Sequence, residues 1–326
     1  MKIFITGADG FIGSHMTKRL ESEHEIFTLE HDLRDHVAVK NQLKRVDPDL
    51  IIHLAARTEV EQSFYEQITF SEINYVGTVN LIESCRELTN LKNFVFASTM
   101  EVYGWQPVSD VIRDGNEVPE DIFAFTEETP PNPNAPYAVA KYGCEKYLEY
   151  AGRCYNLPYT IIRQTNSYGR RDNNFFVTEQ IIYQMLTNPT EINLGYGEPY
   201  RNFIFIEDLL DAWETVIRNP EKVAGEIFCL GPDNAIKIKD YVQLIADKLD
   251  WNGTIYWDTK PVRDGEIFLL NSSHAKLTER TGWKPSVEID EGLDRTIEIW
   301  KDIIANNLPF NNNTKFSRGN NQKFDI

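Results

Sequence analysis

The N-terminal segment constrains the fold more than any other part of the chain. Lys2 to Thr6 form a short apolar run that predicts a buried strand, and Gly7 follows at once. Gly10 and Gly13 then open a helical pattern that starts at Phe11. Because glycine allows sharp turns and close approach of neighbouring backbone, this order of strand, turn and helix predicts the first unit of a doubly wound α/β fold.

Short apolar runs and helical patterns alternate through the first half of the chain. This alternation predicts a doubly wound parallel sheet of the Rossmann type, buried on both faces, with a smaller mixed α/β substrate lobe. We expect strands at 2–6, 25–29, 50–54, 93–98 and 159–163, and helices at 11–23, 36–46, 73–88 and 136–155.

The pattern also predicts a division into domains. Residues 1–165 and about 196–228 are expected to bind the dinucleotide, whereas about 166–195 and 229–305 are expected to form the lobe that binds a nucleotide-sugar. The polar residues 306–326 predict a loosely held tail. Between 105 and 134 the chain carries five prolines without clear periodicity, which predicts a long active-site loop.

Charge and cysteine content exclude several classes of function. With 33 Lys and Arg against 50 Asp and Glu, the net charge is −17, so a surface for nucleic acid or an anionic membrane is not expected. The four cysteines are scattered without ligand spacing, which argues against a metal site and against disulfides. No apolar run is long enough for a membrane span or a leader, so we expect a cytoplasmic protein.

The glycine-rich turn predicts a cofactor site. Its position at the start of a helix lets backbone N–H groups and the helix dipole face a pyrophosphate, whereas the same glycines elsewhere would be an ordinary structural turn. We therefore assign cofactor contacts to Gly7, Gly10, Phe11, Ile12 and Gly13.

The ends of the second and third strands extend this site. Glu30 lies where an acid accepts hydrogen bonds from a ribose, but His31 and Arg34 nearby would favour a 2′-phosphate. The expected cofactor is therefore NAD, with NADP as the alternative. Glu30 is assigned to the cofactor site, and a solvated strand-end charge is the alternative explanation of this residue. Asp32 and Leu33 are expected beside the adenine, and Leu54, Ala55 and Ala56 beside a flat ring.

A tyrosine and a lysine one helical turn apart predict the catalytic base. A nearby Lys141 ammonium favours the Tyr137 phenolate and would lower its pKa. Ser98 ends the fourth strand and Thr99 follows it, where a hydroxyl can bond a sugar or the phenol. Ser98, Tyr137 and Lys141 are also expected to contact the cofactor. Glu101 follows, and its carboxylate can abstract a proton made acidic by an adjacent ketone.

With these motifs in order, the chain resembles the extended short-chain dehydrogenase/reductase family, in its nucleotide-sugar epimerase and dehydratase branch. The resemblance covers residues 1 to about 300. It implies a cofactor contact at Asn74, contacts to the diphosphate of a nucleotide-diphosphate sugar at Asn166, Arg201 and Arg263, and a homodimer through the helix that bears Tyr137. The further matching segments are 53–56, 74–78, 163–169, 201–208, 263–265 and 276–285.

Within this branch, Thr99, Met100 and Glu101 are most similar to the Thr-Asp-Glu triplet of the sugar 4,6-dehydratases. The resemblance implies that Tyr137 takes the C4 hydroxyl proton, that Glu101 removes the C5 proton, and that water leaves from C6. Met100 replaces the aspartate that donates a proton, and a thioether has none to give. Either Glu101 serves as base and acid, or a water substitutes, or no water is eliminated. Arg170 also stands where the family has proline after Tyr168 and Gly169.

Three other functions fit parts of this pattern. A nucleotide-uronate decarboxylase shares the serine-threonine-glutamate segment and needs no acid at position 100. A nucleotide-hexose 4-epimerase needs only Tyr137 and the cofactor. A cofactor-sensing regulator that had lost catalysis would be expected to lack Tyr137 or Lys141, and both are present.

Overall fold

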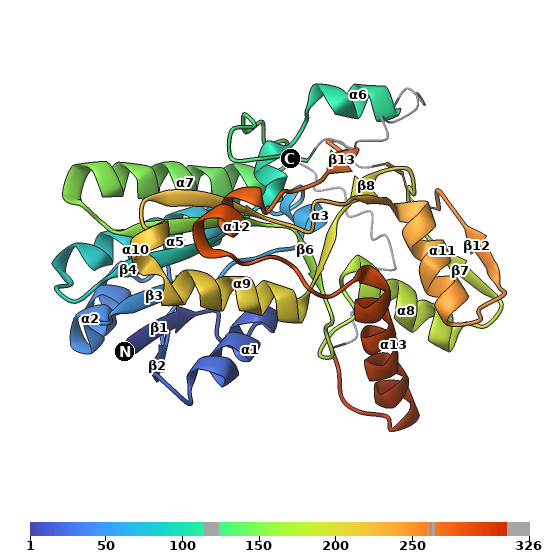
Figure 1. Ribbon diagram of the computed structural model, residues 1–326, viewed down its shortest axis with the longest axis horizontal. Coiled ribbons are helices and arrows are strands. Elements are labelled where there is room, and N and C mark those ends of the chain that lie inside the picture. Colours follow the sequence, from blue (N-terminus) through green and yellow to red (C-terminus); the bar gives the residue numbers. More distant parts are fainter. Residues whose placement is uncertain (114–123, 260, 263–264, 312–326) are drawn as a thin grey trace, which may run out of the picture.

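The computed structural model describes residues 1–113, 124–259, 261–262 and 265–311, and its centre is a parallel sheet (Figure 1). The six strands lie in the order β10-β5-β4-β3-β1-β2, so the chain reverses its direction of travel between β1 and β3. In such sheets, ligands bind at the carboxyl edge beside this switch point. The strands are β1 Lys2–Thr6, β2 Glu25–Thr28, β3 Leu50–His53, β4 Asn93–Thr99, β5 Tyr159–Gln164 and β10 Glu226–Leu230.

Helices cover both faces of the sheet (Figure 1). Alternate residues of β1 point to opposite faces, so Phe4 packs with the helices of one side while Ile3 and Ile5 pack with those of the other. Burial of each such side chain contributes roughly 1.5 to 3 kcal/mol. The first side holds α2 His36–Val46, α5 Gly77–Ser84 and α7 Pro136–Tyr155, and the second holds α1 Phe11–Leu20 and α9 Ile206–Arg218.

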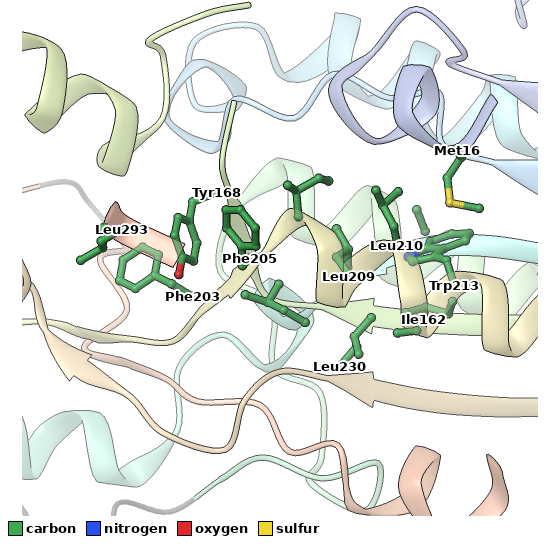
Figure 2. Close-up of a cluster of buried hydrophobic side chains, with 14 of the residues drawn as sticks. Met16, Ile162, Tyr168, Phe203, Phe205, Leu209, Leu210, Trp213, Leu230 and Leu293 are labelled. Atoms are coloured by element: carbon green, nitrogen blue, oxygen red, sulfur yellow. The ribbon is translucent and has the colours of Figure 1, made fainter. Parts of the chain in front are cut away.

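One hydrophobic cluster joins the sheet to the second part of the molecule. In Figure 2, Met16 of α1 and Trp213 of α9 lie beside Ile162 of β5, and the row of buried side chains continues to Tyr168 and Leu293. Leu293 belongs to α13 Ile289–Ala305, which packs on α8 Val177–Thr187. The lobe and the sheet therefore share a continuous core rather than meeting at a polar boundary.

The lobe is built from short strand pairs and helices. β6 Asn166–Tyr168 runs parallel to β9 Phe203–Phe205, immediately after β5. The other elements are β7 Glu191–Asn193, β8 Tyr200–Arg201, α10 Pro220–Val223, β11 Ile236–Lys237, α11 Ile238–Lys248, β12 Thr254–Tyr256, β13 Leu269–Leu270 and α12 Ala275–Thr281.

The predicted fold class is confirmed, and β1, α2 and α7 have the predicted bounds. α7 starts with proline in its first turn and ends at Asn156, whose φ of 56° places it in the left-handed conformation typical of a helix end. The domain division stays a prediction, and β10 runs through the expected boundary near residue 228. Most of the predicted tail lies outside the described residues.

Two segments differ from their predicted structure. Instead of one helix over 73–88, the chain forms a π-helical turn, η1 Ser71–Val76, before α5, and a 3₁₀ turn, η2 Cys85–Glu87, after it. The predicted long loop at 105–134 contains a helix, α6 Pro107–Arg113, before residues outside the description. Three further short elements are α3 Val60–Ser63, α4 Gln67–Phe70 and the 3₁₀ turn η3 Met100–Tyr103. Within the described part of the chain, every helix is too short or too polar to cross a membrane.

Candidate active site

The turn between β1 and α1 packs so closely against neighbouring backbone that it requires glycine. Gly7 has a φ of +71°, and a Cβ on it would lie 2.7 Å from the Ala55 backbone nitrogen. A Cβ on Gly13 would lie 2.0 Å from the Gly7 carbonyl oxygen. Among the described residues no side chain caps the N-terminus of α1, and its first turn carries no acid. This arrangement fits the pyrophosphate of a dinucleotide, which needs free N–H groups and close backbone approach.

A buried chain of hydrogen bonds ties the ends of β1 and β3 to the helices. Thr6 Oγ1 accepts from the Ala55 N–H at 3.2 Å and lies 2.6 Å from His53 Nδ1. His53 Nε2 lies 2.8 Å from Thr78 Oγ1, which donates to the Asn74 carbonyl at 2.6 Å. Burial, and then the charge of Lys141, hold the pKa of His53 well below its usual value. A neutral His53 that donates from Nε2 and accepts at Nδ1 satisfies every group in the chain.

Asn74 is hydrogen-bonded to the backbone of the segment that follows β3. Its Oδ1 accepts from the Arg57 N–H at 2.8 Å, and its Nδ2 donates to the Arg57 carbonyl at 2.8 Å. Asn74 lies in the π-helical turn η1, a type of element that is frequent at functional sites. The residue predicted to contact the cofactor therefore holds in place the segment that follows β3.

The predicted adenosine end lies beyond β2. Glu30 forms an exposed ion pair with Arg45 at 3.1 Å. Asp32 pairs with Arg34 at 2.6 Å, and the hydrogen bonds from Arg34 lower the pKa of Asp32 to about 2. The buried Leu33 is fixed by Asn80, whose Nδ2 donates to its carbonyl at 3.0 Å. Glu30 and Asp32 remain predicted cofactor contacts, and their carboxylates also form the ion pairs with Arg45 and Arg34.

At the end of β4, the structure brings together Tyr137, Thr99 and Glu101. Burial and the charge of Glu101 raise the pKa of Tyr137, and a side-chain hydrogen bond with Thr99 acts in the opposite direction. Glu59, which the sequence analysis did not single out, contributes a smaller effect that also raises this pKa. Thr99 Oγ1 also accepts from the Glu101 N–H at 3.2 Å, so one hydroxyl contacts both the Tyr137 side chain and the Glu101 backbone.

Lys141 does not lower the pKa of Tyr137 as predicted. Its Nζ donates to the Ala97 carbonyl at 2.8 Å and lies 4.8 Å from the centre of the Phe96 ring. Burial lowers the pKa of Lys141 to about 8. The prediction considered only the spacing along the helix, and it missed that the ammonium reaches the β4 backbone and that burial raises the pKa of the phenol.

Ser98, another predicted cofactor contact, is engaged inside the protein. Its hydroxyl donates to Glu145, and Glu145 forms a fully buried ion pair with Arg163 at 2.7 Å. Arg163 also donates to Tyr103 at 3.0 Å. The hydroxyl of Ser98 can therefore only accept a hydrogen bond from a cofactor, since its single donor is used by Glu145. The pairing of Glu145 with Arg163 was missed, although Glu145 shares the helix face of Tyr137 and Lys141 at four-residue spacing.

Met100 lies in a buried apolar cluster with 1% of its surface exposed. The Thr165 hydroxyl donates toward its sulfur at 2.8 Å and also lies 2.8 Å from the Asn202 carbonyl. The side chain thus packs η3, to which it belongs, against the segment that leads from β5 into the lobe. It has no proton to give, and its surroundings are those of a core residue.

The predicted substrate contacts lie on the lobe side. Asn166 is exposed at the start of β6. Arg201 is buried and pairs with Glu266 at 2.7 Å. Arg263 lies outside the described residues. Over the described part of the chain, no group of three or more His, Cys, Asp or Glu is arranged to hold a metal ion.

A sheet of this topology, with a glycine turn at its switch point, is the architecture of enzymes that bind a dinucleotide cofactor. The chain belongs to the NAD dependent epimerase/dehydratase family, whose profile matches residues 3–231. It is therefore an NAD(P)-dependent enzyme of the nucleotide-sugar epimerase/dehydratase group.

Relatives with different activities are equally similar. A putative UDP-glucose 4-epimerase of Methanocaldococcus jannaschii is 28% identical, with 92% of this chain and 98% of the relative covered. A dTDP-glucose 4,6-dehydratase of Escherichia coli K12 is also 28% identical, with 91% and 92% covered. The solved UDP-glucose 4-epimerase of Thermotoga maritima superimposes with a TM-score of 0.82 at 26% identity, over 93% of this chain and all of that one.

Proposed function

We propose that this enzyme is a nucleotide-sugar 4,6-dehydratase that yields a 4-keto-6-deoxy sugar nucleotide. The observation that supports this is the charge of Glu101 acting on the phenol of Tyr137, with the Thr99 hydroxyl bonded to the Tyr137 side chain and to the Glu101 backbone N–H. Oxidation at C4 requires only the tyrosine and the cofactor. A carboxylate at this place supplies the base that the next step, removal of the C5 proton, demands.

One carboxylate is sufficient for the elimination. Tyr137 takes the proton of the C4 hydroxyl, and Glu101 takes the C5 proton. Glu101 then carries the proton that the departing C6 hydroxyl needs to leave as water. The proton held by Tyr137 balances the one that returns to C5. Because the proton balance closes without an acid at position 100, the buried Met100 is compatible with dehydration.

The glycine turn, Glu30, Asp32 and the 54–56 segment would hold the cofactor, and Asn166, Arg201 and Arg263 would bind the substrate diphosphate. A bound oxidised nicotinamide would supply the acceptor for the C4 hydride and, once reduced, the donor of that hydride to C6, and its positive charge would favour the Tyr137 phenolate. Arginine suits the diphosphate because its planar fork engages phosphate oxygens at two points. Glu266 positions Arg201 for this role.

Product masses test the proposal. The enzyme is incubated with dTDP-glucose, UDP-glucose, UDP-N-acetylglucosamine and GDP-mannose, and the products are weighed. Loss of one water supports dehydration. An unchanged mass with a new stereochemistry at C4 would establish a 4-epimerase instead, and loss of carbon dioxide from an added UDP-glucuronate would establish a decarboxylase.

Two variants connect the reaction to these residues. Tyr137→Phe should abolish turnover, since it removes the proton acceptor, whereas Tyr142→Phe on the same helix should not. Glu101→Gln should stop product formation after C4 oxidation, so that reduced cofactor accumulates and is seen by its absorbance. The exposed Glu128→Gln is the control. Full activity in Glu101→Gln would refute the dehydratase assignment.

The 4-epimerase is the second candidate because Met100 lacks the proton of the dehydratase aspartate. It needs no carboxylate at position 101. Glu101→Gln therefore separates the two reactions: it stops a dehydratase and leaves an epimerase able to complete its cycle.

We further propose that the enzyme is a homodimer through α7 and η1. Val139 is 56% exposed on α7, and Gly143, one turn later, packs against the Tyr75 ring of η1. Val76 and Ile68 add exposed apolar surface on the adjoining segment. An apolar surface of this kind on two packed helices is typical of a contact between subunits.

A further inference from the structure

Arg170 is a buried cation at the junction between the cofactor turn and the lobe. It directly follows Gly169, where the family has proline, and only 6% of its surface is exposed. A buried guanidinium needs compensation, because its transfer from water is costly. The neighbours that provide this compensation come from both sides of the proposed active site.

Two aromatic rings enclose the guanidinium. Its Cζ lies 4.2 Å from the centre of the Phe11 ring and 3.8 Å from that of Phe176. Phe11 begins α1 and is part of the glycine turn, whereas Phe176 precedes α8 in the lobe. A cation between two rings gains from both faces when water is excluded.

Polar contacts attach the same side chain to the lobe. Its Nη1 lies 3.6 Å from Oε2 of the fully buried Glu179 on α8, and it donates to the Ser167 carbonyl on β6. Glu179 Oε1 also accepts from the Gly169 and Arg170 backbone N–H groups, at 2.9 and 3.0 Å. Arg170 Nε is buried and has no hydrogen-bond partner among the described residues, so the guanidinium is held by its Nη contacts and by the two rings on its faces.

We propose that Arg170 is a positioning residue that couples cofactor binding to the order of the β6–α8 segment. On one side it fixes Phe11 at the cofactor turn, and on the other it is held by Ser167, Phe176 and Glu179, next to the predicted diphosphate contact Asn166. Cofactor that settles on the glycine turn therefore stabilises the lobe segment through Arg170. Coupling of this kind is reciprocal, so an ordered lobe also strengthens cofactor binding.

Cofactor titration and hydrogen exchange test the coupling without any substrate. Enzyme freed of nucleotide by charcoal is titrated with NAD and with NADP, and amide exchange of residues 166–187 is followed. In the wild-type chain, saturation with cofactor should slow exchange in this segment. Arg170→Met should weaken cofactor binding about tenfold, given the stacking energies of buried cations, and should remove the protection of 166–187 at saturation. The exposed neighbour Arg171→Met is the matched control.

Further variants keep the test decisive if Arg170→Met folds poorly. Phe11→Leu removes one stacking ring while the pair with Glu179 stays intact, and it should cause the same loss of protection. Arg170→Lys keeps the charge without the planar stack and should rescue the effect only in part. Protection of 166–187 by cofactor in folded Arg170→Met or Phe11→Leu enzyme would overturn the proposal. Since no turnover is measured, this result is independent of whether the enzyme dehydrates its substrate.

Discussion

At the residue scale, the surroundings of Met100 decide what a carboxylate there would do. The thioether is packed in an apolar cluster and bonded by Thr165. Met100→Asp would bury a carboxylate without a cationic partner, so we expect a loss of roughly 2 to 4 kcal/mol in the free energy of unfolding and no gain in elimination rate. Met100→Leu should cost less than about 1.5 kcal/mol. Urea unfolding and the dehydration rate measure both. A stable and faster Met100→Asp enzyme would show that this side chain reaches the substrate.

The buried Lys141 gives a pH-dependent prediction. Its pKa is about 8 in the folded chain against 10.5 as the ordinary value, so between these limits the unfolded chain binds more protons. The free energy of unfolding therefore increases as pH rises from about 8 to 10.5. Below pH 8 the full energetic cost of burying Lys141 is present. We expect Lys141→Met to be inactive yet more stable at pH 7 by roughly 1 to 3 kcal/mol. This advantage should shrink toward pH 10. Urea unfolding at several pH values checks it, with Lys146→Met as control; an advantage that does not depend on pH would contradict it.

At the scale of single elements, the turn between β1 and α1 carries the strongest constraint. Because a Cβ at Gly13 would lie 2.0 Å from the Gly7 carbonyl oxygen, Gly13→Ala must displace α1 from β1. We expect cofactor affinity to fall at least about a hundredfold, as the pyrophosphate site is lost. At Gly195 an added Cβ meets nothing within 4 Å, so Gly195→Ala is the control. Isothermal titration with NAD measures both; unchanged affinity in Gly13→Ala would contradict the assignment of this turn to cofactor binding.

Sequence reasoning was reliable where one local signal decided the element. Proline at the start of α7 and the apolar run of β1 gave correct bounds. The π-helical turn η1 escaped it, because a turn of six residues is too short for its apolar pattern to be told from that of an α-helix.

In the candidate site, the motifs located Tyr137 and Glu101, which the fold does bring together. The contact partners of the site residues could not be predicted from the sequence. Arg57 for Asn74, Ala97 for Lys141 and Thr165 for Met100 are contacts between distant segments, and only the folded chain shows them.

At the scale of the whole molecule, charge and core set the conditions for substrate binding. A chain with a net charge of −17 repels an anionic diphosphate, so the arginines that we propose as its contacts must overcome the surrounding field. The hydrophobic cluster shared by sheet and lobe includes Phe203 and Phe205 of β9, the strand that follows Arg201, so this part of the lobe is packed in the same core as the sheet (Figure 2). Substrate affinity is therefore expected to depend on the packing of both parts.

The proposed homodimer gives the last prediction. Val139 lies on the exposed apolar surface of α7, four residues before the glycine that receives the Tyr75 ring. In a two-fold symmetric contact each substitution occurs twice, so Val139→Glu places two carboxylates in one apolar interface and should yield monomers. Val37→Glu, on the exposed side of α2, is the matched control and should leave the dimer intact. Light scattering after size-exclusion chromatography measures the mass of each.

A wild-type enzyme that is monomeric would refute the proposed dimer, and a Val139→Glu enzyme that stays dimeric would place the interface elsewhere. Because α7 also bears Tyr137, loss of the dimer should lower turnover while the β1–α1 turn still binds cofactor.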